Sequence, residues 1–252
     1  GGMPREVSTR FFGRVIERLR HKGRAITLHD YERMTLEAFP EIFKVKCITH
    51  TKAGVAGLTD TYRAPGHVTL AVIPDILRFP AAQKLRPKAS SALLCRIEEY
   101  FAERTSCFVK VIVVNPIFQQ VQVAGKVVLH SGRDMAFYKD QLQKDVLEFL
   151  TPWAFGEQDT LSFGGRLFRS SVLNFVERLE YVDFLTDFGL FDEADLALEN
   201  NLSVVEALTE RHVLAAGDLT GLVVIENPDP ATKIPLPEAA KLGRLIIGVD
   251  LA

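Results

Sequence analysis

One stretch near the N-terminus contains a helix that leads directly into a strand, and it constrains the fold more than any other part of the chain. Thr27 is a favourable N-cap, and Asp30 can bond back to the free backbone N–H of the cap, so a helix is predicted to begin just after Thr27. Pro40 ends this helix. Apolar residues then alternate with Lys44 and Lys46, which predicts a strand that is wet on one face.

The predicted helix has one apolar face, because Tyr31, Met34 and Ala38 recur at positions i, i+3 and i+7. The opposite face is predicted to meet solvent. Its residues are Asp30, Glu32, Arg33 and Glu37.

Several short motifs in this stretch and downstream of it resemble one known family. They are Arg18-Leu19-Arg20-His21-Lys22, Phe39-Pro40, Lys44-Val45-Lys46-Cys47, Pro65-Gly66-His67-Val68, Pro152-Trp153-Ala154-Phe155, Phe163-Gly164-Gly165-Arg166 and Tyr181-Val182-Asp183. They are similar to the C-terminal half of baseplate J-like proteins, which are wedge components of contractile phage tails and of extracellular contractile injection systems. The resemblance runs from about residue 14 to about residue 190, and His29 departs from it, since an aromatic residue is expected there.

This resemblance implies a structural wedge subunit that acts by assembly and not by catalysis. The expected partners are other baseplate wedge proteins or another copy of the same chain, with no nucleic acid, membrane or small-molecule substrate. The resemblance also implies a cytoplasmic protein during assembly that later becomes part of a phage tail or injection particle. Relatives are usually longer, so the chain is expected to correspond to their C-terminal portion.

Composition is that of an ordinary globular protein, with 47% hydrophobic and 25% charged residues among 252. No run of 18 apolar residues occurs, which argues against a membrane-spanning helix. Cys47, Cys95 and Cys107 form no CxxC pair, so unpaired buried thiols in a reducing compartment are expected.

The predicted fold class is α+β, with two successive helix-on-sheet units of the plait-like, ferredoxin-like kind. An N-terminal amphipathic helix and linker occupy residues 1–26. The first unit is expected at 27–116 and the second at 117–190, and an acidic segment with a β-rich tail covers 191–252. Within this tail, residues 202–208 and 212–216 are predicted to form a hairpin, followed by strands at 222–225 and 245–249. The tail is expected to lie along a core or along a neighbouring chain.

Ser90 or Ser91 is predicted to cap the second helix of the first unit. Residues 117–130 are predicted to form a long strand in which apolar residues alternate with Gln120, Gln122, Ala124 and Lys126, and Gly125 suggests a bulge or close backbone packing there.

Charge is concentrated in two blocks. Six Arg or Lys residues and one acid lie between residues 10 and 24, whereas seven acids and no Lys or Arg lie between residues 180 and 200. Both blocks are candidate docking surfaces, although a solvated surface or contact between the two blocks within one fold are alternatives. The candidate interface residues are Arg14, Arg18, Arg20, Lys22, Asp183, Asp187, Asp192 and Glu193. Binding to nucleic acid is disfavoured, since the net charge is −2 and no aromatic residues interleave the basic ones.

Three aromatic residues are predicted to have structural roles. Trp153 and Phe155 lie in a short Pro-bounded segment, where they are expected to cover the end of a sheet, with the indole packed against the second unit. Tyr31 belongs to the core face of the first predicted helix.

The sequence contains no motif typical of catalysis or of cofactor binding, such as GxGxxG, GxxxxGK[ST], HExxH or GxSxG. We therefore expect no catalytic residue, no cofactor and no metal. Two alternatives remain open: a small-molecule-binding regulatory plait, which would need buried polar groups around a pocket, and an enzyme whose site is assembled from scattered residues.

Overall fold

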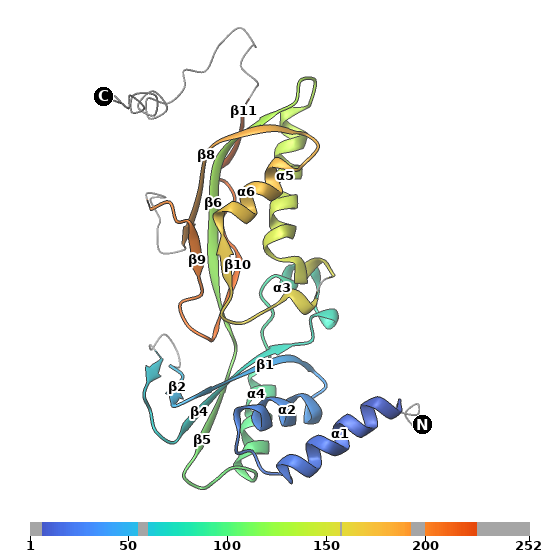
Figure 1. Ribbon diagram of the computed structural model, residues 1–252, viewed down its shortest axis with the longest axis vertical. Helices are drawn as coiled ribbons and strands as arrows, with labels where there is room; N and C mark the ends of the chain where they lie inside the picture. The colour runs from blue at the N-terminus through green and yellow to red at the C-terminus, as the bar shows by residue number, and fades with distance from the viewer. Residues whose placement is uncertain (1–6, 55–59, 157, 193–199, 226–252) are drawn as a thin grey trace, which may run out of the picture.

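A continuous passage from strand β5 (Lys110–Val114) to strand β6 (Ile117–Leu129) joins two α+β units that lie end to end (Figure 1). The structure is a computed structural model, and it describes residues 7–54, 60–156, 158–192 and 200–225. Asn115 and Pro116 separate the two strands, so each strand belongs to a different sheet.

The first unit is a three-stranded sheet with helices packed against it (Figure 1). Its strand order is β1 (Ile42–Thr49), β4 (His67–Pro74), β5, with β1 antiparallel and β5 parallel to β4. Helix α2 (Leu28–Ala38) delivers the chain into β1, and α4 (Ser91–Ala102) connects β4 to β5. A crossover through a helix is the usual way to join two parallel neighbouring strands.

The ends of both helices agree with the sequence prediction. The Thr27 side chain accepts a hydrogen bond from the Asp30 backbone N–H, and the Asp30 carboxylate accepts one from the Thr27 N–H, which completes the predicted capping box. Ser90 caps α4 in the same way by accepting from Leu93 N–H.

The second unit is built around the long strand β6. Strand β8 (Val182–Asp192) pairs antiparallel with one edge of β6, while β10 (His212–Ala216) and β11 (Leu222–Ile225) pair in parallel with the other edge. Helices α5 (Met135–Leu150) and α6 (Arg169–Glu177) pack together on one face of this sheet (Figure 1). The predicted alternation of β6 is confirmed, because Val121, Val123 and Val127 are buried.

The strands after residue 200 complete the second sheet, and the predicted hairpin between residues 202–208 and 212–216 is wrong. Strand β9 (Val204–Glu206) pairs with β7 (Arg166–Phe168), whereas β10 pairs with β6. The reason is that the edge of β6 opposite β8 is long enough for two short strands, so β10 and β11 pair with it one after the other. The predicted strand at 245–249 lies outside the described residues.

Several shorter elements complete the chain. They are α1 (Ser8–His21), β2 (Thr51–Lys52), β3 (Thr61–Tyr62), η1 (Ile76–Arg78), α3 (Ala81–Lys84), η2 (Pro152–Phe155) and η3 (Gln158–Thr160).

Each unit has its own apolar core, and a third cluster lies between them. This junction cluster consists of Ile73, Ile76, Trp153, Leu161, Val213 and Ala215. Since β4 and η1 supply the first two and the second unit supplies the rest, the junction is a packed interface and not a flexible linker.

The α+β prediction is confirmed, whereas the plait detail is not, because the first sheet has three strands and includes a parallel pair. The division into four segments stays a prediction. The burial of two side chains differs from the prediction. Asp30, predicted to face solvent, is buried because its carboxylate caps α2, and Ala38, predicted on the apolar face, is exposed at the last turn of α2. Among the thiols, Cys47 is buried as expected, but Cys95 and Cys107 are exposed.

Candidate assembly surfaces

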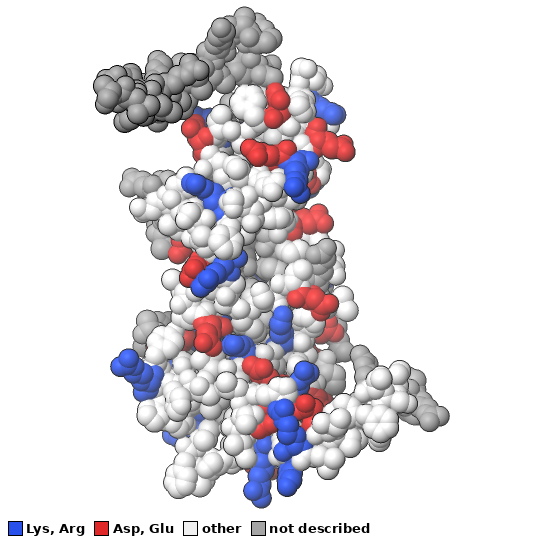
Figure 2. Space-filling model, viewed as in Figure 1, with Lys and Arg blue, Asp and Glu red and all other residues white. Residues whose placement is uncertain are grey.

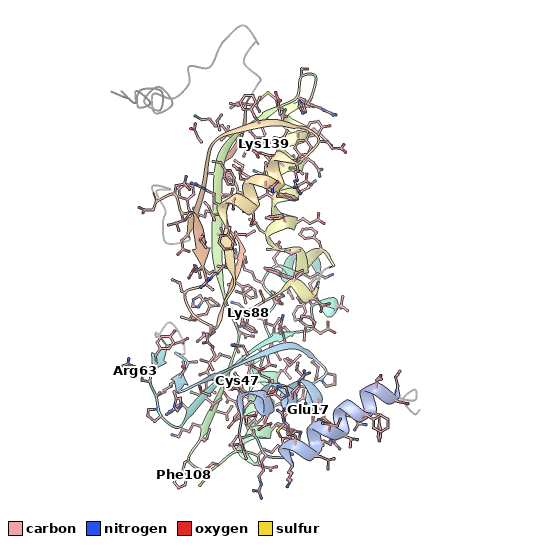
Figure 3. The ribbon with its side chains drawn as sticks, in the orientation of Figure 1. Glu17, Cys47, Arg63, Lys88, Phe108 and Lys139 are labelled. Atoms are coloured by element: carbon pink, nitrogen blue, oxygen red, sulfur yellow. The ribbon has the colours of Figure 1, made fainter. Side chains whose placement is uncertain are left out.

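Helix α1 is held against the first unit by its charged side. Arg18 Nε donates to Glu37 Oε1 at 3.0 Å. Glu17, labelled on α1 in Figure 3, lies 3.3 Å from His29 Nε2 on α2. His29, the position where the family resemblance predicts an aromatic residue, is thus a polar tie between the two helices in this chain.

A third contact between α1 and α2 involves the Asp30 carboxylate that caps α2. Arg20 lies 3.5 Å from Asp30, whose side chain is only 6% exposed. Burial by itself would raise the pKa of Asp30, but hydrogen bonds from Thr27 and Ile26, together with the Arg20 side chain, outweigh burial and lower this pKa below its ordinary value of 3.8. Asp30 is therefore an anion at neutral pH that serves both the cap and α1.

The apolar stripe of α1 points away from the rest of the molecule. Phe12 and Ile16 are each 61% exposed and Leu19 is 69% exposed. The helix protrudes at the lower right of Figure 1, and the same lobe in Figure 2 is mostly uncharged. Helix α1 therefore presents its apolar stripe to solvent and not to the first unit. The surface beneath α1 offers the carboxylates of Glu37 and Asp30, which attract its charged side.

The acidic candidates lie on β8, at the opposite end of the described chain from α1 (Figure 1). Asp187 pairs with Lys126 Nζ at 2.7 Å, Asp183 lies 3.6 Å from His130 Nδ1, and Asp192 accepts from Gln119 Nε2 at 3.0 Å. Glu193 lies outside the described residues.

The two charge blocks therefore have separate neighbourhoods. In the part of the chain that the structure describes, the interactions found for Arg18 and Arg20 stay within the first unit, and those found for Asp187 stay within the second. Among the remaining basic candidates, the Arg14 guanidinium lies 5.7 Å from the centre of the Phe11 ring, and Lys22 ends α1 in a left-handed conformation. The docking role of both blocks stays a proposal.

The aromatic residues differ in burial. Trp153 is 6% exposed and lies in the junction cluster, so it contacts residues from both units and not the second unit alone. Tyr31 is 4% exposed, with its ring centre 5.3 Å from that of Phe101. Phe155, however, is 51% exposed, so the prediction that it covers the end of a sheet is wrong. The one-turn geometry of η2 buries Trp153 and turns Phe155 outward.

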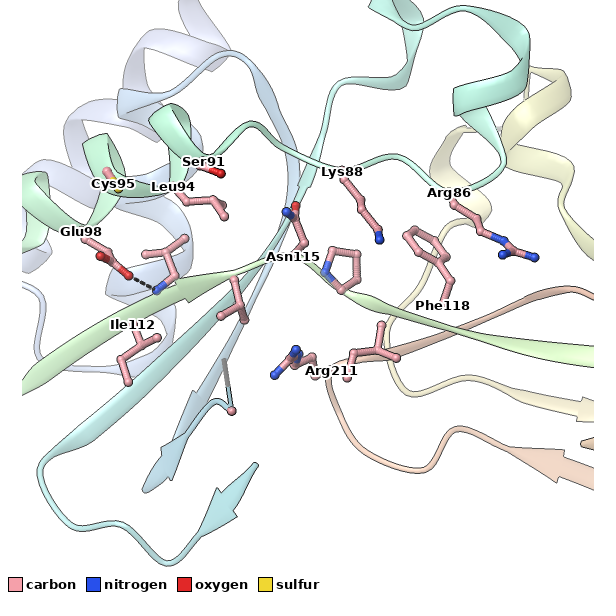
Figure 4. Close-up of a pocket in the computed structure, with 15 residues that line it drawn as sticks. Arg86, Lys88, Ser91, Leu94, Cys95, Glu98, Ile112, Asn115, Phe118 and Arg211 are labelled. Carbon is pink, nitrogen blue, oxygen red and sulfur yellow. Dashed lines mark hydrogen bonds between the residues drawn. The ribbon is translucent and has the colours of Figure 1, made fainter. Parts of the chain in front are cut away.

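A cleft of about 660 Å³ lies where the two units meet (Figure 4). Three cationic side chains, Arg86, Lys88 and Arg211, contribute to its lining. Arg211 Nη1 donates to Asp60 Oδ1 at 2.6 Å, and both side chains of this pair are about nine-tenths buried, at 11% and 9% exposed. Sequence reasoning missed this pair, because 151 positions separate its members and no local pattern links them.

Two other polar side chains of the cleft, Glu98 and Asn115, are bound to the backbone. Glu98 accepts from Val113 N–H at 2.8 Å, and the Asn115 amide exchanges two hydrogen bonds with the backbone of Ala89. The first bond holds α4 against β5, and the other two hold the residue that follows β5 to the segment that precedes α4. These bonds therefore indicate a structural role. Arg211 Nε is the exception, being buried without a partner among the described residues.

Two further observations concern the described residues only. No three His, Cys, Asp or Glu side chains there are grouped closely enough to hold a metal ion. None of the helices in these ranges combines the length and the apolar character that crossing a membrane requires.

Comparison with known proteins gives a family and a fold. A family model described as "Baseplate protein PVC11-like" matches residues 1–215. No protein with a curated description matches the chain. Among solved structures, a chain of the anti-feeding prophage (AFP) baseplate, determined by cryo-electron microscopy with six-fold symmetry imposed, has a similar fold with a TM-score of 0.61 and 24% identity. The match covers 86% of the present chain and 43% of that chain, so the present chain spans less than half of its length. The resemblance to baseplate proteins seen in the sequence is thereby confirmed.

Proposed function

Because the chain belongs to the PVC11-like family of baseplate proteins, we propose that it is a structural wedge subunit in the baseplate of a contractile injection particle or phage tail. It acts through protein–protein assembly and performs no catalysis. It assembles in the cytoplasm and is then retained in the particle. The match of the family model to residues 1–215 is the single observation that carries this proposal.

The charge distribution supports an assembly role. Arg14, Arg18, Arg20 and Lys22 make one end of the chain basic, and Asp183, Asp187, Asp192 and Glu193 make another segment acidic. In our proposal these two surfaces meet neighbouring wedge proteins and set the register and the rate of encounter more than the final affinity. A single exposed pair contributes only about 0–1 kcal/mol, so several charges must act together.

The small-molecule alternative receives less support. It requires buried polar groups that converge on a pocket, and in the junction cleft Glu98 and Asn115 are already bound to backbone groups. These bonds hold α4 and the segment before it to β5 and to the residue that follows β5, so they support a structural role for these groups within the first unit.

The test is incorporation into particles. The gene for this chain is deleted from a baseplate gene set and replaced by a variant in which Arg14, Arg18 and Lys22 are changed to Glu. We expect a folded variant that enters baseplates slowly and with an altered salt dependence, because the long-range attraction is reversed. Electron microscopy and quantitative blotting of purified particles measure incorporation.

Two controls separate charge from folding. A chain with Lys52, Lys110 and Lys139 changed to Glu carries the same change in net charge on side chains remote from α1, and it is expected to assemble normally. Adding Glu37→Lys to the triple variant restores an ion pair at position 18, so that helix detachment is not mistaken for lost docking. Normal incorporation of the folded triple variant, at the normal salt dependence, would refute a role for the basic surface.

A further inference from the structure

The apolar stripe of α1 is uncovered within the described chain. Phe12, Ile16 and Leu19 recur at i, i+4 and i+7, so they form one line about 10 Å long on the solvent side of the helix. Within the described chain α1 contacts the body with its opposite, charged side. A contiguous apolar line of this kind, flanked by charges, is typical of a helix that docks into a groove on another protein.

The second unit carries a groove of matching chemistry. It measures about 600 Å³ and lies between α5, η2 and α6. Phe149 and Phe175 stack with their ring centres 4.3 Å apart, and the exposed Phe155 borders the groove from η2. The remaining apolar lining comes from Pro152 and Leu179. Because Phe155 points outward, its ring enlarges this apolar surface.

The charges beside the two surfaces are opposite. Glu148 and Asp145 line the groove. Asp145 accepts from Tyr181 Oη at 2.7 Å, whereas Glu148 is exposed and has no ion pair or hydrogen bond among the described residues. The α1 stripe ends at Leu19, three residues before Lys22, and the Lys22 side chain is likewise exposed, with no ion pair or hydrogen bond in the described ranges.

We propose that α1 of one copy of this chain docks in the α5–α6 groove of a second copy. This inference rests on the proposed assembly role and adds the identity of one partner. Docking places Phe12, Ile16 and Leu19 on the stacked phenylalanine rings and brings Lys22 toward Glu148. The contact is heterologous, since two different surfaces meet, so repetition leads to a ring or an open filament and not to a closed pair.

Two other arrangements are less favourable. Contact between the α1 stripes of two copies would bring two basic helices together, and like charges would repel. Docking of α1 into the groove of its own chain would require α1 to leave the first unit and break its ties to Glu37 and Asp30, because the groove lies on the other unit (Figure 1).

The experiment uses two variants of the chain that break one surface each. Ile16→Ser with Leu19→Ser removes the stripe and keeps the groove, while Phe155→Ser with Glu148→Lys damages the groove and keeps the stripe. All four side chains are exposed or at the surface, so both variants are expected to fold. Sedimentation velocity measures the mass of each protein at concentrations up to roughly 100 μM, which covers weak contacts.

The expected outcome is specific to a heterologous contact. The unmodified chain forms species larger than a dimer as concentration rises, and each variant alone is a monomer. An equimolar mixture of the two variants forms a one-to-one dimer and nothing larger, since one intact stripe and one intact groove remain. Phe108→Ser, which removes an even more exposed ring at the far tip of the first unit, leaves association unchanged (Figure 3).

Charge reversal gives a second readout. Lys22→Glu raises the dissociation constant about fivefold, and Glu148→Lys on the partner restores it. A chain that stays monomeric throughout, or a mixture that stays monomeric while the unmodified chain associates, overturns the inference. If association is absent but the charge variants of α1 still fail to enter particles, the proposed assembly role stands and only the choice of partner is wrong.

Discussion

Trp153 shows how one side chain can join two units. It is the single tryptophan of the chain, it is 6% exposed, and it packs between Ile73 of β4 and Val213 of β10. Its Nε1 donor has no partner among the described residues, so its contribution comes from packing and not from hydrogen bonding.

We predict that Trp153→Ala lowers the free energy of unfolding by roughly 3–5 kcal/mol, because it leaves a cavity in the junction cluster. Trp153→Phe should cost much less, since it fills part of the space and removes an unpaired donor. Phe155→Ala, at an exposed position two residues away, is the matched control and is expected within about 0.5 kcal/mol of the unmodified chain. The free energy of unfolding is measured by urea titration, followed by fluorescence for the Phe155 variant and by circular dichroism for the two variants that lack tryptophan. Native emission like that of free tryptophan would contradict this prediction.

At the scale of elements, β10 and β11 occupy successive parts of one edge of β6 and are separated by the Gly217–Gly221 turn. Gly125 N–H donates to Gly221 O at 3.0 Å, which brings the two backbones close together. A Cβ atom at Gly221 would lie 2.8 Å from the Cβ of Ala124, nearer than such atoms can approach. Glycine at position 221 therefore allows β11 to pair with β6.

Gly221→Ala should push β11 away from β6 and reduce stability by about 1–3 kcal/mol, the range typical of overpacking. Gly165→Ala is the control, because its nearest heavy atom would be 3.8 Å away and no strained backbone angle is involved. Hydrogen exchange of the Val224 and Ile225 amides measures local opening of β11. Equal exchange rates in the two variants would show that the short distance between position 221 and β6 does not exclude a side chain there.

At the scale of the whole molecule, polar ties accompany the junction cluster. Arg211 and Asp60 form a buried ion pair between the units, and Lys44 Nζ of β1 donates to Leu161 O at 2.6 Å. Both ties join residues that are more than a hundred positions apart. The two units are therefore expected to unfold together.

Arg211→Met should cost roughly 3–5 kcal/mol, because the Asp60 carboxylate would be left buried without its cation. We expect the single heat-capacity peak of the unmodified chain to split into two, one for each unit. Adding Asp60→Asn should recover a large part of the loss, since the uncompensated charge is then absent. Differential scanning calorimetry measures all three proteins, and an unchanged single peak for Arg211→Met would refute this coupling.

Local features of the chain could be predicted from the order of its residues. The capping box of α2, the Ser90 cap, the end of the helix at Pro40 and the alternation along β6 each depend on neighbours within a few positions. The bulge expected at Gly125 also occurs, with a register shift between Ala124 and Lys126. For the candidate surfaces, the distribution of charge along the chain predicts a basic and an acidic segment, but not which sides of them are exposed.

Tertiary structure decided which of these features meet. Periodicity predicts that α1 has an apolar side, but which side faces the body depends on the carboxylates of Glu37 and Asp30, far along the chain. The partner of β10 is likewise a strand about ninety residues earlier, and the α5–α6 groove combines side chains from three elements. Burial and pairing energies depend on distance in space, whereas a sequence pattern reports only distance along the chain. Backbone caps and turns could therefore be predicted from sequence alone, and the surfaces available for assembly could not.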